Sequence, residues 1–508
     1  MASDAARTQV ERNRLGQFAT PAGLAADILE YARRQIPASH KIRFLEPAFG
    51  GGSFYAALLQ LFPPSQIEKA SGYEIDPRCA GEAARLWANT LLDLRLEDFT
   101  QALLPSSESD KANLLICNPP YVRHHHLSPE EKGRLQSIVN RVTHAELNGR
   151  AGLYCYFLLL AHGWMAHNCL AGWLIPSEFM DVQYGQPIRE YLTHSVTLLH
   201  IHRFDPTEVQ FDDSLVSSAV VWIRNKRPET GQDVHFSYGG TLLEPKSSCG
   251  VSLDTLRTAH KWTRFCEMSP KPISEIARNR TKLSDLFRVK RGLATGANKF
   301  FILTPEQAKS REIPDKFLTP ILPSPRYLMT NEVKADDNGH PALDQRLFLL
   351  DCDLPEHDVR TMYPRLWQYL QTGAERGVKE RHLCRHRTLW YSQENRPPSP
   401  LLCTYMGSNS EKPFRFILNH SVATASNGYL VLYPIPALQK ELMGKGELLR
   451  AIWQALNDIP SDELKAAGRV YGGGLYKIEP KELASVSADR VLAVLSGDML
   501  RNDRQSLQ

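Results

Sequence analysis

The fold of this chain is decided by the stretch Ala112-Asn113-Leu114-Leu115-Ile116-Cys117-Asn118-Pro119-Pro120-Tyr121. Its first six residues are mostly apolar, which is typical of a buried strand. The two prolines end that strand in a rigid turn, because proline has a fixed φ and no N–H group to donate. The turn presents one amide side chain, adjacent backbone carbonyls and an aromatic ring. Those groups suit an exocyclic amino group that is to be held and used as a nucleophile.

Around this stretch, the first half of the chain alternates short apolar strands with amphipathic helices. Such alternation is the signature of a parallel sheet covered by helices on both faces. Strands are expected at Ile42 to Glu46, Ala70 to Ile75, Asn113 to Cys117, Gly172 to Ile175, Val196 to His202 and Val216 to Ile223. Helices are expected at Ala22 to Arg34, Ser53 to Leu61, Arg78 to Thr90 and Tyr154 to Ala166. The sequence therefore predicts an α/β fold with a doubly wound, mostly parallel sheet.

The alternation ends at about Ser237, where strand-like pieces, glycine and proline become more frequent. At 508 residues, the chain is long enough for two domains that each bury a core. We expect a domain boundary near residues 240 to 270, with a first domain at residues 1–245 and a second, mixed α+β domain at residues 246–508. No internal repeat is visible, which argues against a solenoid.

The composition is that of a globular protein, with 42% hydrophobic and 23% charged residues. No window holds the roughly 18 consecutive apolar residues of a membrane span, and the polar start Met1 to Arg14 is unlike a secretion signal, so we expect a cytoplasmic location. The nine cysteines include no Cys-x-x-Cys pair. The adjacent histidines His124 to His126 cannot all face one ion from a regular element, so no metal site is expected. A net charge of +4 does not by itself identify a polyanionic partner.

Three further features lie at the ends of predicted strands that precede the Asn-Pro-Pro turn. Phe44 to Phe54 runs from a strand through three glycines into a helix, where a ligand can lie against the backbone. Glu74 ends the next strand, where an acid commonly accepts hydrogen bonds from ribose hydroxyls. Asp98 offers a third acid for an adenine amino group, and Phe99 a ring to cover the adenine face. The glycine turn is neither a P-loop nor Gly-x-Gly-x-x-Gly, so a nucleoside without phosphate is favoured.

In their order along about the first 225 residues, these motifs resemble the γ-class, TaqI-like adenine-N6 DNA methyltransferases, which use S-adenosylmethionine. Gln17-Phe18-Ala19-Thr20-Pro21 is similar to the amino-terminal cofactor motif of that family, and Glu46-Pro47-Ala48 to its methionine-binding loop. By this resemblance Glu74 would hold the ribose, Asp98 and Phe99 the adenine, and Pro120 would lie against the cofactor. The full set of cofactor-binding residues expected from the resemblance is Thr20, Glu46, Pro47, Ala48, Phe49, Gly50, Glu74, Ile75, Asp98, Phe99 and Pro120.

The resemblance and the chemistry of an aromatic amine together assign the catalytic roles. Hydrogen bonds from an adenine amino group to the Asn118 side-chain oxygen and the Pro119 carbonyl would favour an electron-rich nitrogen as it attacks the methyl group. The adenine has to leave the duplex and lie between flat side chains. Tyr121 is expected to form one wall and Phe211 the other. The predicted catalytic residues are therefore Asn118, Pro119, Pro120, Tyr121 and Phe211.

Two clusters of basic residues in the second half have aromatic neighbours. One surrounds Leu286 to Gly292. The other consists of Arg376, Lys379, Arg381, Arg385 and Arg387 beside Trp390 and Tyr391. Such clusters can neutralise phosphates and reach bases, although a solvated charged face explains either cluster alone equally well. Phe416 to Tyr429 and Arg469 to Pro480 resemble segments of target-recognition domains in the same family, so a DNA-recognition domain is expected.

The resemblance implies a monomeric, site-specific adenine-N6 methyltransferase that acts on double-stranded DNA and protects host sites from a partner restriction endonuclease. Three alternatives stay open. A protein-glutamine or RNA methyltransferase would use the same Asn118 turn, although the large second domain argues against the compact glutamine enzymes. A non-catalytic DNA specificity subunit is disfavoured by the intact tetrapeptide. A fused methyltransferase-nuclease is disfavoured because the sequence shows no convincing nuclease cluster of acids and lysine.

Overall fold

The computed structural model describes residue 16 and residues 18–206, 217–265, 281–409, 411–471 and 474–505. The chain forms two compact units. The first comprises Met1–Lys271 with Tyr471–Gly473, and the second comprises Pro272–Val470 with Gly474–Gln508. Among the described residues, no helix combines the length and the apolar character needed to cross a membrane.

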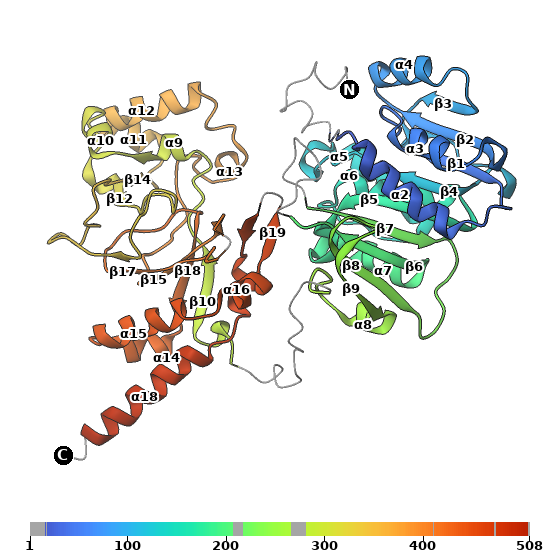
Figure 1. The fold of residues 1–508 in the computed structure, drawn as a ribbon. Helices are drawn as coiled ribbons and strands as arrows, with labels where there is room; N and C mark the ends of the chain where they lie inside the picture. The colour runs from blue at the N-terminus through green and yellow to red at the C-terminus, as the bar shows by residue number, and fades with distance from the viewer. Residues whose placement is uncertain are drawn as a thin grey trace. The chain divides into compact units, whose positions relative to one another are not determined.

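A nine-stranded sheet forms the centre of the first unit, in the order β3-β2-β1-β4-β5-β7-β6-β8-β9 (Figure 1). Its strands are β1 (Ile42–Glu46), β2 (Ile67–Glu74), β3 (Leu92–Leu96), β4 (Ala112–Cys117), β5 (Met165–Pro176), β6 (Thr197–Arg203), β7 (Ser218–Arg224), β8 (Asp233–Gly240) and β9 (Pro245–Ser252). The five neighbours β3, β2, β1, β4 and β5 run parallel, and β6 is parallel to β8. Only β7 and β9 run antiparallel to their neighbours. The predicted mostly parallel sheet is confirmed.

Helices cover both faces of this sheet because a strand turns alternate side chains to opposite sides. In β4, Leu114 and Ile116 face a core shared with α2 and α3, whereas Leu115 and Cys117 face a core shared with α5, α6 and α7. The helices of this unit are α2 (Ala22–Gln35), α3 (Ser53–Leu61), α4 (Pro77–Leu86), α5 (Pro129–Thr143), α6 (Leu153–Leu160), α7 (Gln186–His194) and α8 (Leu253–Thr258). The doubly wound arrangement is therefore also confirmed.

The helix expected at Tyr154 to Ala166 ends earlier than the sequence indicated. It stops at Leu160, and a short 3₁₀ turn leads into β5, which begins at Met165 and runs for 12 residues. The residues on both sides of this change are apolar and buried, so hydrophobicity alone does not separate a buried helix from a buried strand here.

Residue 245, the expected end of the first domain, lies in the large sheet. Pro245 is the first residue of β9, which pairs with β8 as an antiparallel hairpin. Most residues of β9 are small or polar and are partly or fully exposed, so this strand has no apolar run that would predict it. The first unit extends to Lys271.

The second unit contains a five-stranded sheet in the order β10-β18-β15-β17-β13 and a three-stranded sheet in the order β11-β14-β12. Its strands are β10 (Phe287–Arg291), β11 (Ile302–Leu303), β12 (Leu318–Pro320), β13 (Glu332–Val333), β14 (Phe348–Leu350), β15 (Leu401–Thr404), β16 (Met406–Gly407), β17 (Phe416–Asn419), β18 (Tyr429–Pro434), β19 (Arg469–Tyr471) and β20 (Leu475–Lys477). Its helices are α9 (Asn298–Phe301), α10 (Pro305–Ser310), α11 (Glu356–Met362), α12 (Pro364–Glu375), α13 (His382–Arg385), α14 (Pro436–Leu442), α15 (Gly446–Asn457), α16 (Ser461–Ala467), α17 (Pro480–Ala484) and α18 (Asp489–Gln505). The expected mixed α+β character is confirmed.

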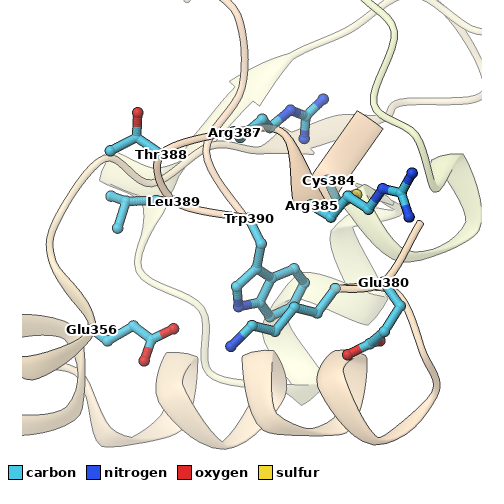
Figure 2. A pocket seen from close by; sticks show the side chains of 9 residues that line it. Glu356, Glu380, Cys384, Arg385, Arg387, Thr388, Leu389 and Trp390 are labelled. Atoms are coloured by element: carbon cyan, nitrogen blue, oxygen red, sulfur yellow. The ribbon is translucent and has the colours of Figure 1, made fainter. Parts of the chain in front are cut away.

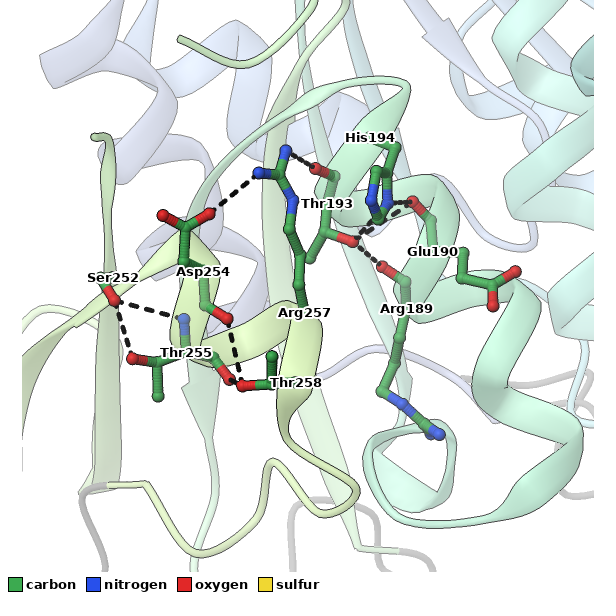
Figure 3. A network of polar contacts seen from close by, with 9 residues as sticks. All are labelled: Arg189, Glu190, Thr193, His194, Ser252, Asp254, Thr255, Arg257 and Thr258. Carbon is green, nitrogen blue, oxygen red and sulfur yellow. Dashed lines mark hydrogen bonds and ion pairs between the residues drawn. The ribbon is translucent and has the colours of Figure 1, made fainter. Parts of the chain in front are cut away.

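A polar network joins α7 to α8 in the first unit (Figure 3). The Arg257 guanidinium donates one hydrogen bond of 3.0 Å to the Thr193 carbonyl, near the carboxyl end of α7, and another of 3.0 Å to the Asp254 carboxylate. The last carbonyls of a helix lack intrahelical partners, and a positive charge next to them is favourable. Because the Asp254 side chain is 80% exposed, its ion pair with Arg257 contributes little.

We expect Arg257→Leu to lower the free energy of unfolding by about 1 kcal/mol, because the Thr193 carbonyl loses its charged donor. Asp254→Asn is the matched control and should cost less than about half of that. Urea unfolding followed by tryptophan fluorescence would measure both changes. Equal losses in the two variants would show that the exposed ion pair, and not the helix end, carries the stabilisation.

Candidate active site

The Asn-Pro-Pro-Tyr tetrapeptide follows directly after β4, which lies between β1 and β5. Since these three strands are parallel, their carboxyl ends meet at one edge of the sheet. Pro119 is buried, whereas Asn118 and Pro120 are partly exposed at this edge. The tetrapeptide therefore lies at the carboxyl-end edge of the parallel strands, where open α/β sheets bind ligands.

The Asn118 side chain has a fixed donor side and a vacant acceptor side. Its Nδ2 group donates hydrogen bonds to the Phe18 carbonyl at 3.0 Å and to Oγ1 of Thr20 at 3.1 Å. Its Oδ1 atom is buried and has no hydrogen-bond partner within the described part of the chain. A buried acceptor without a donor costs about 1–3 kcal/mol, so its presence needs an explanation. An incoming N–H donor would satisfy it.

Tyr121 is 8% exposed and held at three points. Its hydroxyl donates to the Leu174 carbonyl at 3.1 Å, and its backbone N–H donates to the Gly16 carbonyl at 3.0 Å. Its ring lies 5.5 Å from the Phe18 ring, centroid to centroid. The structure therefore places the predicted wall residue at the edge of the core with little free ring surface. Phe211, predicted as the second wall, lies outside the described residues.

The turn between β1 and α3 has open space above two of its three glycines. Gly50 has a φ of +54°, and a Cβ atom added to Gly50 or Gly51 would meet no heavy atom of the described residues within 4 Å. The Phe49 ring points the other way. It is buried, and a Cβ on Gly72 would lie 2.5 Å from it. A ligand can therefore approach the backbone here, and the predicted contact of Phe49 would come from its backbone.

Two buried acids stand beside this turn. Glu74, at the end of β2, accepts hydrogen bonds from the Gly50 N–H at 2.8 Å and the Asp76 N–H at 2.7 Å, and burial raises its pKa. Glu46, at the end of β1, is 2% exposed, and its Oε2 atom has no partner in the described ranges. Burial and the nearby Glu74 carboxylate raise the pKa of Glu46 well above its usual value. Between Glu46 and the glycines, Pro47 is buried and Ala48 is partly buried.

Asp98 follows β3 and caps the short turn that comes next. One carboxylate oxygen accepts from the Thr100 N–H at 2.9 Å and from the Thr100 hydroxyl at 2.8 Å, and the other accepts from the Gln101 amide at 2.8 Å. The Arg134 guanidinium lies 3.9 Å from the second oxygen. These bonds fix the carboxylate in place. A carboxylate has about four lone-pair sites, so it retains capacity for another donor.

The exposed apolar surface at this edge comes from Ile75, which is among the residues expected to bind the cofactor, and not from the Phe99 ring. Ile75, next to Glu74, is 67% exposed. Phe99 is 4% exposed, and its ring lies 5.3 Å from the Tyr73 and Trp164 rings, in an aromatic cluster inside the core. A flat ligand held by Glu74 and Asp98 would therefore meet Ile75, whereas the Phe99 ring supports the edge from within.

These groups fit a nucleoside that carries an amino acid part. Three acids at neighbouring strand ends provide acceptors for hydroxyl and amino groups, Ile75 provides an apolar surface, and the open side of Gly50 gives access to the backbone.

The three-histidine segment His124–His126 forms a 3₁₀ turn. Within the described residues no group of His, Cys, Asp or Glu is arranged to hold a metal ion.

The structure adds Phe18, Gly16 and Leu174 to the residues around the tetrapeptide. The sequence predicts Thr20 as a cofactor-binding residue and places Phe18 in the same motif, but it does not indicate that either residue contacts Asn118. The contacts join positions 100, 98 and 53 residues apart for Asn118 with Phe18, Asn118 with Thr20, and Tyr121 with Leu174. No local sequence pattern predicts which backbone carbonyl accepts a hydrogen bond from a distant side chain.

A cavity of about 420 Å³ lies in the second unit (Figure 2). It is lined by Glu356, Lys379, Glu380, Cys384, Arg385, Arg387, Thr388, Leu389 and Trp390. Figure 2 shows the Trp390 indole with Glu356 and Glu380 on either side of it in this view. Nη2 of Arg387 donates to the Ala294 carbonyl at 2.8 Å, whereas its Nη1 is buried and unpartnered among the described residues. Three residues of the second predicted basic cluster, Lys379, Arg385 and Arg387, thus line this cavity.

Comparison with known proteins extends over both units. Residues 73–210 match the family model of the Eco57I restriction-modification methylase, and residues 259–503 match the model of the C-terminal domain of Type II methyltransferase M.Eco57I. The Type II methyltransferase M.AccI of Acinetobacter calcoaceticus is 27% identical over 93% of this chain and 85% of its own length. M.XamI of Xanthomonas campestris pv. amaranthicola is 27% identical over 92% of this chain and 84% of its own length.

Among solved structures, the chain is similar in fold to the Type IIL restriction-modification enzyme MmeI, determined in complex with DNA. The TM-score is 0.52 at 13% identity, and the match covers 92% of this chain and 71% of MmeI. The chain spans 60% of the type IIG restriction endonuclease BpuSI, with a TM-score of 0.45 at 14% identity. The first model lies within the first unit and the second spans most of the second unit, and the resemblance drawn from the motifs is confirmed. The chain is similar over parts of both units to restriction-modification methyltransferases of the Eco57I type.

Proposed function

We propose that this protein is a site-specific DNA adenine-N6 methyltransferase that uses S-adenosylmethionine and protects host DNA from a separate, cognate restriction endonuclease. The observation that carries the proposal is the buried Oδ1 atom of Asn118, directly after β4, which has no hydrogen-bond partner among the described residues. The family and the Type II methyltransferase relatives support it, as does the fold shared with MmeI, which was determined with DNA. We further propose that the chain acts as a monomer.

S-adenosylmethionine, when bound, supplies an electrophilic sulfonium methyl group. Glu74 would accept hydrogen bonds from its ribose hydroxyls and Asp98 from its adenine amino group, while Ile75 would cover one face of the base. Thr20, Glu46 and the segment Pro47 to Gly50 would hold the methionine part. The Gly50 N–H, already bound to Glu74, keeps the turn and the ribose site in one fixed geometry.

Asn118 Oδ1 and the Pro119 carbonyl accept hydrogen bonds from the two N–H groups of the target amine. An adenine amino nitrogen is a poor nucleophile because its lone pair is delocalised into the ring, and two acceptors favour a more pyramidal, electron-rich nitrogen. Holding this nitrogen in line with the methyl group adds the advantage of proximity. The proton leaves after transfer, when the nitrogen has become cationic and acidic, so no strong base is required.

The target adenine has to leave the duplex to reach this edge, at a cost of a few kcal/mol. Tyr121, Pro120 and Phe211 are proposed to border the extrahelical base. In the second unit, Lys379 and Arg385 are exposed beside the cavity and are proposed to contact DNA phosphates. The second unit would thereby act as the target-recognition domain.

Labelled S-adenosylmethionine should transfer its methyl group to duplex DNA and not to RNA or protein. Sequencing of modified bases in DNA from cells that express the chain should locate N6-methyladenine at one recurring sequence. Label found only in protein or RNA, or on cytosine, would overturn the proposal.

Asn118→Ala should lower the turnover rate by at least about a thousandfold, because the amine loses a preorganised acceptor in a water-poor site. Cofactor affinity, measured by calorimetry, should stay within about twofold, since Asn118 is assigned to the substrate. A variant that turns over at a near-normal rate would remove Asn118 from the mechanism.

Cofactor affinity should fall as the pH drops through the raised pKa of Glu74, because the protonated carboxyl group has lost an acceptor for the ribose hydroxyls. The affinity is therefore full above that pKa and declines below it. Calorimetry between about pH 5 and 8 would show the decline. Glu74→Gln, which does not titrate, is the control for the titration of the cofactor itself. A decline of the same size in the control would assign the effect to another group.

Lys379→Ala and Arg385→Ala should each weaken DNA binding for all sequences and reduce the slope of log K against log salt by about 1. The matched control is Arg365→Gln, because Arg365 is 61% exposed on α12 and pairs with Glu312 at 3.3 Å, away from the cavity lining. Fluorescence anisotropy at several salt concentrations would measure the slopes. A control slope reduced as much as those of the two variants would mean that net charge alone is responsible.

A further inference from the structure

We propose that Phe18 and Thr20 are positioning residues, which hold the Asn118 amide in the one orientation that turns its oxygen toward the substrate amine. This inference rests on the proposed function of Asn118 and adds the reason why its side chain is oriented. The amide of asparagine carries an acceptor and a donor of nearly equal size on opposite sides. A rotation by 180° would therefore present NH₂ groups to each other and block the reaction.

Both protons of the Asn118 Nδ2 group are already used. One bond of 3.0 Å runs to the Phe18 carbonyl, and one of 3.1 Å runs to Oγ1 of Thr20. The Oδ1 atom on the opposite side is buried and finds no partner in the described ranges. The protein thus satisfies the donors completely and leaves only the acceptor to a substrate.

The Phe18 carbonyl determines which of the two orientations of the Asn118 amide is favoured. A carbonyl oxygen only accepts hydrogen bonds, so in the rotated amide it would face Oδ1 of Asn118, another acceptor. That orientation loses one hydrogen bond and adds a repulsion between two oxygens. The Thr20 hydroxyl is able to donate or accept, so it strengthens the observed orientation without deciding it alone.

The segment that carries these acceptors is tied to the same tetrapeptide. The Gly16 carbonyl accepts from the Tyr121 N–H at 3.0 Å, and the Phe18 ring lies 5.5 Å from the Tyr121 ring. A Cβ atom at Gly16 would lie 2.5 Å from the Tyr121 nitrogen, so the two backbones approach too closely for a side chain. Phe18 also packs against the core that contains α2. The acceptors and the amide therefore move as one body.

Thr20 has two possible roles that an experiment separates. If it served only to bind the cofactor, loss of its hydroxyl would lower cofactor affinity and leave turnover at saturation unchanged. If it positions Asn118, loss of the hydroxyl lowers the turnover rate even when cofactor and DNA are saturating. Its hydroxyl accepts from Asn118 and still has a proton to donate, so both roles are compatible in one residue.

The test compares Thr20→Val, which removes the hydroxyl at nearly constant size, with Thr20→Ser, which keeps it. We expect Thr20→Val to lower kcat about tenfold at saturating cofactor and DNA, with the KM for DNA within about twofold. Thr20→Ser should recover kcat to within about threefold of the original chain. A normal kcat in Thr20→Val, with only a raised cofactor Kd, overturns the proposal.

A second measurement uses the chain alone and needs no activity. In protein labelled with ¹⁵N-asparagine, the Asn118 side-chain signal is identified by its loss in Asn118→Ala, and its NH₂ protons should exchange slowly because both are hydrogen-bonded. We expect Thr20→Val to speed this exchange about tenfold and Thr20→Ser to leave it slow. An exchange rate that Thr20→Val leaves unchanged overturns the proposal.

Thr193→Val is the matched control. Thr193 is buried in the same unit, and its hydroxyl donates to the Arg189 carbonyl at 2.7 Å, within the α7 network of Figure 3. This variant should leave both kcat and the Asn118 exchange unchanged. If the original chain transfers no methyl group to DNA, the proposed function fails, whereas the exchange measurement still decides whether the amide is held.

Discussion

The parallel alignment of β1 to β5 is the constraint on which the candidate site depends. β1 and β2 end in the buried acids Glu46 and Glu74, Asn118 directly follows β4, and the parallel direction brings these positions to one edge of the sheet. Within the part of the chain that the structure describes, Glu46 and Asn118 each keep one buried side-chain oxygen without a hydrogen-bond partner. Hydrophobic burial of the strands, which offsets the cost of such groups, comes from two separate cores on the two faces.

The electrostatics of this edge favour a ligand that donates hydrogen bonds to the buried carboxyl groups. Burial raises the pKa of both Glu46 and Glu74, which means that a negative charge is costly there unless hydrogen-bond donors compensate it. Two backbone N–H groups already compensate Glu74. A ligand rich in hydroxyl and amino groups would supply the remaining donors. The open sides of Gly50 and Gly51 leave room for such a ligand next to the backbone.

The second unit is built on another plan. Its five-stranded sheet buries Leu401 and Cys403 of β15 on the face covered by the carboxyl-terminal helices, and Leu402 on the opposite face. The cavity next to Trp390 lies within a third cluster, built around α9, α11 and α12. The described part of this unit therefore packs around three separate hydrophobic clusters.

The sequence by itself determined the α/β class, the central strand that ends at Cys117 and the order of the motifs, because these depend on local runs of apolar residues and on the rigid proline turn. It did not reveal the β8-β9 hairpin, whose strands lack an apolar run, or the end of α6, where helix and strand are equally apolar. Only the tertiary structure decided that Phe99 lies inside an aromatic cluster and that Phe18 and Thr20 bind Asn118. The two contacts of Asn118 join residues 100 and 98 positions apart, and a bond to a backbone carbonyl cannot be predicted from residue type, because every residue has that group.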